Sequence, residues 1–123
     1  MEAQSFGDKV GYQAKVGAKD KSTGLCLRLV GFAVQRAKGI KEHKLGIESA
    51  KDAGTWVISQ GYYVSNTSNY VNGTIVVFQS IGTHNHGHIQ VYYDGKWYSD
   101  FKQKGFWPFA DGSKPAYQVY IPN

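Results

Sequence analysis

The segment Thr74–Phe78 is apolar or β-branched at every position. A continuous run of this kind is typical of a central strand buried within a sheet. Further strands are predicted at residues 88–93 and 96–101, joined through Asp94-Gly95, and at residues 117–121. Because the predicted helices come before the strands, the expected fold class is α+β, with N-terminal helices packed on an antiparallel β-sheet.

Two helices are predicted ahead of the sheet. Apolar side chains recur at three- and four-residue intervals over residues 26–38, and a glycine follows. Thr23 is expected to cap this helix, which places Cys26 in its first turn. A capping-box-like start predicts the second helix over residues 49–61. Residues 1–24 have weak periodicity and are expected to form an arm or loop.

Length and charge indicate the number of domains and the kind of partner to expect. The 123 residues are expected to form a single domain, 1–123. A net charge of +5 favours a polyanionic partner, which is nucleic acid, an anionic membrane or a cell wall. The first residues lack the charged start and apolar stretch of a signal peptide, and no apolar run is long enough to span a membrane. We therefore expect a chain made without a signal peptide and not inserted in a membrane.

Cys26 is the only cysteine, so it cannot form an internal disulfide. At a helix N-terminus the unpaired N–H groups and the helix dipole favour the thiolate, and the backbone N–H of Cys26 points toward a developing oxyanion. Packing between helix and sheet is the alternative role for this side chain. A nearby base would decide in favour of catalysis.

The predicted hairpin after His88 supplies that base. If Gly95 belongs to a three-residue loop, Tyr92 faces Lys96 and His88 lies opposite Asp100, on a polar face. A two-residue turn would instead place Asp100 among apolar side chains, without a partner. We therefore predict the three-residue loop, and with it a catalytic Cys-His-Asp triad.

Two other classes of function are open. Alternating histidines at positions 84, 86 and 88, with Asp100, would suit a zinc or copper site if the segment is a strand. The Thr-Asn-Gly surroundings of His84 and His86 favour a loop, so we predict no metal and no cofactor. The basic charge and the 15% aromatic content also suit a nucleic-acid- or polysaccharide-binding module without catalysis.

A cysteine at a helix start, a second helix and a strand that opens with Gly87-His88-Ile89 resemble the papain-like NlpC-type and CHAP cell-wall peptidases. Leu25 and Leu27 depart from the residues that usually flank the NlpC nucleophile. A closer resemblance, to the small amidase effectors of type VI secretion and to phage and domesticated lysins, rests on the segments STGLCLRLVGFAV, SAKDAGTWVISQGY, NGTIVVFQ and GHIQVYYDGKWYSDFKQ.

The resemblance implies a peptidoglycan-degrading cysteine amidase or endopeptidase that hydrolyses an amide bond in the peptide stem or cross-link, acting as an antibacterial effector toxin. A phage-type endolysin of the same chemistry is the alternative. A specialised system would secrete the protein, which would act as a monomer in the periplasm or cell wall of a target bacterium. Its expected partners are peptidoglycan and an immunity protein that occludes the active site, with no nucleic acid. The implied catalytic residues are Cys26, His88 and Asp100, and the implied substrate or oxyanion residues are Tyr12, His86 and Trp107.

Overall fold

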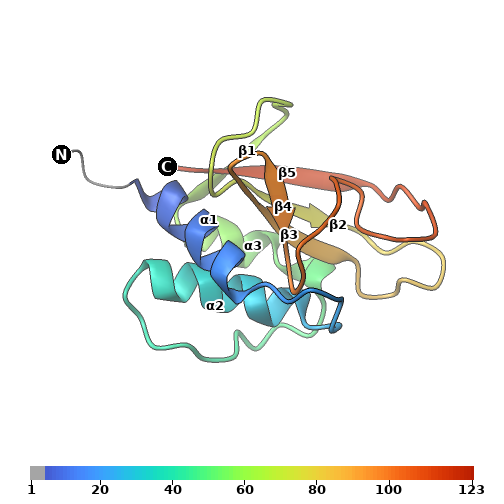
Figure 1. Ribbon diagram of the computed structural model, residues 1–123, viewed down its shortest axis with the longest axis horizontal. Coiled ribbons are helices and arrows are strands. Elements are labelled where there is room, and N and C mark those ends of the chain that lie inside the picture. Colours follow the sequence, from blue (N-terminus) through green and yellow to red (C-terminus); the bar gives the residue numbers. More distant parts are fainter. Residues whose placement is uncertain (1–4) are drawn as a thin grey trace.

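The computed structural model describes residues 5–123, which form helices on one side of a five-stranded antiparallel sheet (Figure 1). The strand order is β1-β5-β2-β3-β4. The α+β class and the antiparallel sheet are therefore confirmed. The elements are α1 (Phe6–Gly17), α2 (Cys26–Ala37), the 3-10 helix η1 (Ala50–Asp52), α3 (Gly54–Ser59), β1 (Tyr62–Ser65), β2 (Ile75–Phe78), β3 (His88–Tyr93), β4 (Lys96–Tyr98) and β5 (Tyr117–Pro122).

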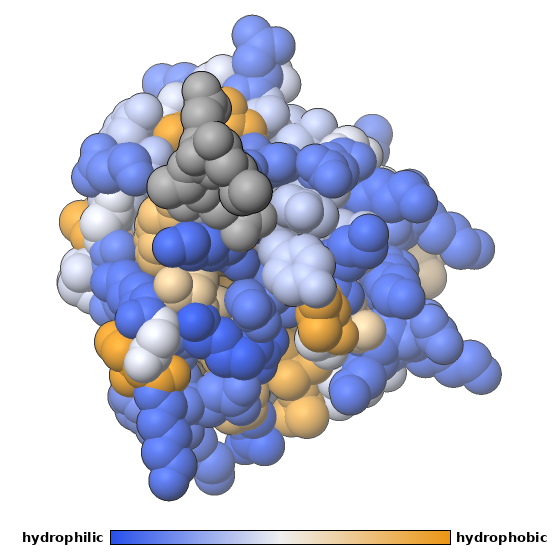
Figure 2. Space-filling model, turned by 60° about the vertical axis from the view of Figure 1, so that its left-hand side comes forward, coloured by the Kyte–Doolittle hydropathy of each residue, from blue (hydrophilic) through white to orange (hydrophobic). Residues whose placement is uncertain are grey.

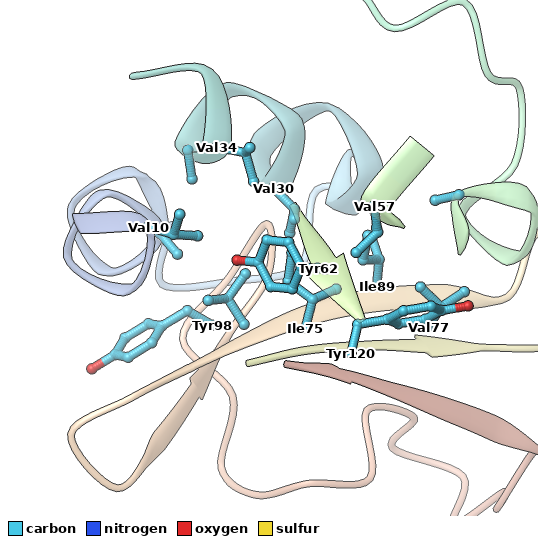
Figure 3. Close-up of a cluster of buried hydrophobic side chains, with 14 of the residues drawn as sticks. Val10, Val30, Val34, Val57, Tyr62, Ile75, Val77, Ile89, Tyr98 and Tyr120 are labelled. Atoms are coloured by element: carbon cyan, nitrogen blue, oxygen red, sulfur yellow. The ribbon is translucent and has the colours of Figure 1, made fainter. Parts of the chain in front are cut away.

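Strand β2 lies in the middle of the sheet and is buried along its whole length, as its sequence predicts. Its odd-numbered side chains, Ile75 and Val77, face the helices. There they pack with fully buried valines of α1, α2 and α3 and with side chains of neighbouring strands (Figure 3). Burial of each such aliphatic side chain stabilises the fold by about 2 kcal/mol. This cluster includes Val10, Val30, Val34, Val57, Tyr62, Ile89, Val91, Tyr98 and Tyr120.

The opposite face of the sheet, here called the outer face, is covered by loops. Val76 and Phe78 of β2 pack there with Trp97, Val119 and Ile121. Aromatic side chains from the loops, Tyr70 and Phe106 among them, pack on this second cluster. Both faces of the sheet are therefore buried, one under helices and the other under aromatic loop residues.

One face of the molecule is mostly hydrophilic (Figure 2). Hydrophilic residues predominate on the face shown in Figure 2, and hydrophobic residues form only small patches there. Within the described part of the chain, none of the helices combines the length and the apolar character that crossing a membrane demands.

The prediction of an arm or loop over residues 1–24 is wrong for residues 6–17, which form α1, and residues 1–4 lie outside the described part of the chain. Ser5 caps α1 by accepting a hydrogen bond from Asp8 N. The helix packs closely through small residues. A Cβ atom on Gly11 would lie 2.5 Å from the Tyr93 ring. Small residues contribute little to hydrophobic periodicity, and the pattern was therefore weak.

The predicted second helix is shorter than expected and is divided into η1 and α3. Ser49 makes no cap bond; its hydroxyl binds the His86 ring instead. Gly54 begins α3 under the hydroxyl of Tyr120, where a Cβ atom would lie 2.3 Å from that oxygen. A close tertiary contact thus interrupts the expected helix.

The predicted register of the β3–β4 hairpin is also wrong. Tyr93 pairs with Lys96 across a two-residue turn, in which Asp94 and Gly95 both have positive φ angles. This is the backbone of the tight turn that Asp-Gly sequences favour, and Asn72 supports it by accepting a hydrogen bond from Asp94 N. The predicted register assumed that one face of the hairpin is polar. Both faces of the sheet are in fact buried, so polarity does not distinguish the two registers here.

Candidate active site

Cys26 is the first residue of α2, as predicted. Its helix begins without a side-chain cap, so the expected role of Thr23 as the cap is wrong. Burial raises the pKa of the Cys26 thiol to about 11, against an opposing effect of the backbone N–H groups of Ile89, Leu27 and Cys26 itself. The thiol is therefore protonated at neutral pH, and the expectation that the helix N-terminus favours the thiolate is wrong, because burial outweighs the effect of the backbone N–H groups.

The thiol opens onto a cleft of about 480 Å³. The start of α2 forms one side of the cleft, and the loop of residues 43–48 lies opposite. Arg28, Lys44 and Glu48 bring charges of both signs to the lining, and His86 also lines the cleft, near η1. A substrate in this cleft would have direct access to a nucleophile at a helix N-terminus.

His88 is the first residue of β3 and is 5% exposed. Strand β4 pairs only with residues 91–93 of β3. Residues 88–90 of β3 therefore lie beyond β4, near the start of α2 and the segment after β4. The backbone N–H of Ile89, the residue that follows His88, is near enough to the Cys26 thiol to oppose the rise in its pKa. The start of α2 therefore lies near the end of β3 that bears His88, while the His88 ring itself contacts Phe78 on the outer face and is not among the residues that line the cleft.

The His88 ring is held by a glutamine, which sequence reasoning missed. His88 Nε2 lies 2.7 Å from Gln103 Oε1. The Gln103 amide nitrogen donates to Gln90 Oε1 at 2.8 Å, and the Gln90 amide nitrogen donates to the backbone oxygen of Phe106 at 2.9 Å. This chain of bonds fixes each amide, so Oε1 of Gln103 must accept from Nε2–H. The lone pair of the neutral ring is then on Nδ1, free to act as a base.

Burial lowers the pKa of His88 to about 4, although the bond to Gln103 and the charge of Asp100 oppose the shift. The unfolded chain would take up a proton near pH 6.5, whereas the folded chain would not. We therefore expect the free energy of unfolding to fall by about 3 kcal/mol as the pH drops from about 6.5 to about 4. Urea unfolding of the wild type and His88→Asn at both pH values would isolate this contribution. An equal pH dependence in the two proteins would contradict the assignment.

Asp100 is buried, but it does not lie opposite His88 as predicted, because β4 ends at Tyr98. Its carboxylate accepts hydrogen bonds from the backbone N–H groups of Thr23 and Gly24, at 2.5 and 3.0 Å, and from the hydroxyls of Thr23 and Ser99. Burial raises the pKa of Asp100, but these bonds outweigh it and bring the pKa below its usual value. Asp100 thus holds the segment that leads into Cys26.

The other two histidines of the predicted run point to different partners. His84 Nε2 lies 2.8 Å from Asp111 Oδ2, and its ring stacks on Phe109. His86 Nδ1 lies 2.6 Å from the Ser49 hydroxyl. Residues 5–123 contain no group of three or more potential ligands arranged for a metal ion.

Two of the predicted substrate residues lie away from the cleft. Tyr12 packs on Tyr93, at the far end of β3 from His88. Trp107 lies on the outer face of the sheet, where it contacts Phe78 and Tyr117. Only His86, of the three residues named for substrate or oxyanion contact, lines the cleft beside Cys26.

Gly87 allows the chain to turn into β3 directly before His88. Its φ angle is +68°, and a Cβ atom there would lie 2.1 Å from the backbone oxygen of Phe78. Neither atom can move without disrupting the β2–β3 ladder. We expect Gly87→Ala to lower the free energy of unfolding by about 3 kcal/mol, as measured by urea unfolding. Gly82→Ala is the control, because its φ angle is also positive but nothing lies near its Cβ position. Equal losses in the two variants would refute the steric explanation.

No protein-family model and no curated protein matches the chain. Two solved structures do match, both of the type VI effector–immunity complex Tae3–Tai3 from Ralstonia pickettii. A chain of the native complex is 32% identical to this chain, with a TM-score of 0.82. The match covers 95% of this chain and 98% of the matched chain. The selenomethionine complex is 30% identical over 91% and 98%, with a TM-score of 0.79. With this identity over nearly the full length of both chains, the protein belongs to the family of the type VI effector Tae3.

Proposed function

We propose that this protein is an antibacterial effector of type VI secretion, a papain-like cysteine hydrolase that cleaves an amide bond in the peptide stem or cross-link of peptidoglycan. The observation that carries the proposal is the place of Cys26, at a helix N-terminus beside a cleft and near the strand end that bears His88 and its Gln103 partner. Membership of the Tae3 family supports the effector role.

In the proposed reaction His88 acts as general base. Because thiol and imidazole are both neutral at pH 7, Nδ1 takes the thiol proton as Sγ attacks the amide carbon. The oxyanion that forms would face the backbone N–H of Cys26. The C–N bond then breaks, and the amine leaves with the proton from His88. Water, activated by the same imidazole, hydrolyses the thioester to a carboxylate and restores the thiol.

Gln103 is proposed as the residue that positions His88. A neutral amide can fix the ring and its tautomer without adding a charge. We expect Gln103→Ala to lower kcat about 10- to 100-fold with KM unchanged, because the ring would lose its orientation but the cleft would not change. Gln79→Ala, at an exposed glutamine whose amide donates only to Lys51 O, should leave both constants unchanged. A change confined to KM would contradict a positioning role.

A cognate immunity protein is the proposed partner. The matched structures are effector–immunity complexes, and the cleft beside Cys26 is the surface that such a protein would need to cover to stop hydrolysis.

The function is tested by incubating the protein with purified sacculi and analysing the soluble fragments by mass spectrometry. New amine and carboxyl ends are expected, at a rate that does not change when a metal chelator is added. The masses of the fragments identify the bond. Binding to sacculi without new amine ends would overturn the proposal and favour a binding module, whereas loss of activity with chelator would favour metal-dependent hydrolysis.

A further inference from the structure

We propose that the outer face of the sheet carries a second binding site, which takes a sugar chain and is separate from the cysteine cleft. The site is a hollow of about 320 Å³ between the loop after β1 and strand β5. Residues 65–68, Tyr70, Tyr117 and Gln118 line it. Its size lies at the lower end of the range for small-ligand sites, which is enough for one or two sugar rings.

The polar groups of the hollow suit a sugar. Hydroxyls from serine and threonine and the amides of Asn66 and Gln118 provide both donors and acceptors, and among residues 5–123 no charged side chain contributes to the lining. The Gln118 amide nitrogen already donates to the backbone oxygens of Ser65 and Val119, which fixes the amide and leaves its oxygen as the acceptor for a ligand. Neutral donors and acceptors match hydroxyl and acetamido groups, whereas a nucleic acid would need cations for its phosphates.

Aromatic rings continue the hollow along the surface. Tyr117 is 45% exposed and Trp107 is 39% exposed, although both belong to the aromatic layer over the sheet. Their ring centroids are 5.7 Å apart, and the rings are nearly perpendicular. The Lys114 amine lies 5.7 Å over one face of the Trp107 ring and covers it, so Tyr117 offers the more exposed ring. The apolar C–H face of a sugar can stack on the Tyr117 ring while its hydroxyls reach the polar hollow.

This surface lies next to the proposed base. Phe78 contacts Tyr117 at 5.6 Å and Trp107 at 6.0 Å between ring centroids, and it contacts the His88 ring at 5.9 Å. One aromatic side chain therefore separates the proposed sugar site from the proposed base. A glycan bound there would hold its attached peptides near the active site. The identity of the sugar chain as the wall glycan rests on the proposed function, but the binding itself requires no hydrolysis.

Titration of an N-acetylglucosamine hexasaccharide into Cys26→Ala protein, followed by calorimetry or NMR, tests the inference. We expect saturable binding that Tyr117→Ala weakens at least about tenfold, because a stacking ring is lost. Asn66→Ala, which removes an exposed amide and no packing, should weaken binding about threefold. Tyr12→Ala is the matched control, since Tyr12 is 48% exposed and contacts Tyr93, and it should bind like the parent.

The inference is overturned if the parent protein does not bind the hexasaccharide, or if Asn66→Ala and Tyr117→Ala both bind it as the parent does. A thermal melt shows whether Tyr117→Ala is folded, and if it is not, Asn66→Ala decides. Failure of the proposed function is distinguishable: sacculi would then give no new amine ends, while the hexasaccharide would still bind. The proposal is also refuted if this face binds a protein but no sugar, and neither Asn66→Ala nor Tyr117→Ala blocks that binding.

Discussion

Replacing Cys26 by alanine is expected to lower the rate of amide release from peptidoglycan by about 10⁴-fold or more. The thiol is the only one in the chain, and Cys26 begins α2 and lines the cleft. The side chain is half-buried, so its loss should change the melting temperature by only a few degrees. Release of free amines from sacculi and a thermal melt measure the two effects.

The two histidines near Cys26 provide a matched pair for the same assay. His88→Asn should lower the rate by about 10³-fold or more, because the base is removed. His86→Asn should lower the rate about tenfold at most. His86 lines the cleft and binds Ser49, but the residue that Gln103 binds is His88. The reverse order would assign the base to His86. Full activity of Cys26→Ala would exclude the cysteine mechanism.

The elements that carry this mechanism could be predicted because their sequences leave few alternatives. A continuous apolar, β-branched run has no stable place except inside a sheet, and β2 is found there. The apolar spacing after Cys26 fits one helix face, and α2 begins at that residue. Both predictions depend on local patterns, which tertiary contacts here reinforce.

The register of the hairpin and the partner of His88 could not be predicted in the same way. The predicted register depended on a polar outer face, but aromatic loop residues cover the outer face of the sheet. Gln103 lies in a segment without regular periodicity, and only the reversal of the chain after β4 brings it to His88. The only signal in the sequence was Gln90, a polar residue in an apolar strand, which needed a buried partner and found Gln103.

The wrong register places Asp100 in a different role, which a substitution can distinguish. Asp100→Ala is expected to lower the free energy of unfolding by about 2 kcal/mol, because the backbone N–H groups of Thr23 and Gly24 would lose their charged acceptor. Activity should fall with it, since the segment that enters α2 at Cys26 would no longer be fixed. Urea unfolding and the sacculus assay measure both effects.

Asp111→Ala is the control for this substitution. Asp111 also accepts several hydrogen bonds, from Ser113 and His84, but it is exposed, and its loss should change stability far less.

The folded-state pKa of Asp100 is lowered, so its contribution to stability is present above the usual carboxyl pKa and is lost as the pH falls through the lower folded value. The stability difference between wild type and Asp100→Ala should therefore shrink in strong acid. If Asp100 were instead the third catalytic residue, Asp100→Asn would reduce kcat without reducing stability, and that result would restore the triad that the sequence predicts.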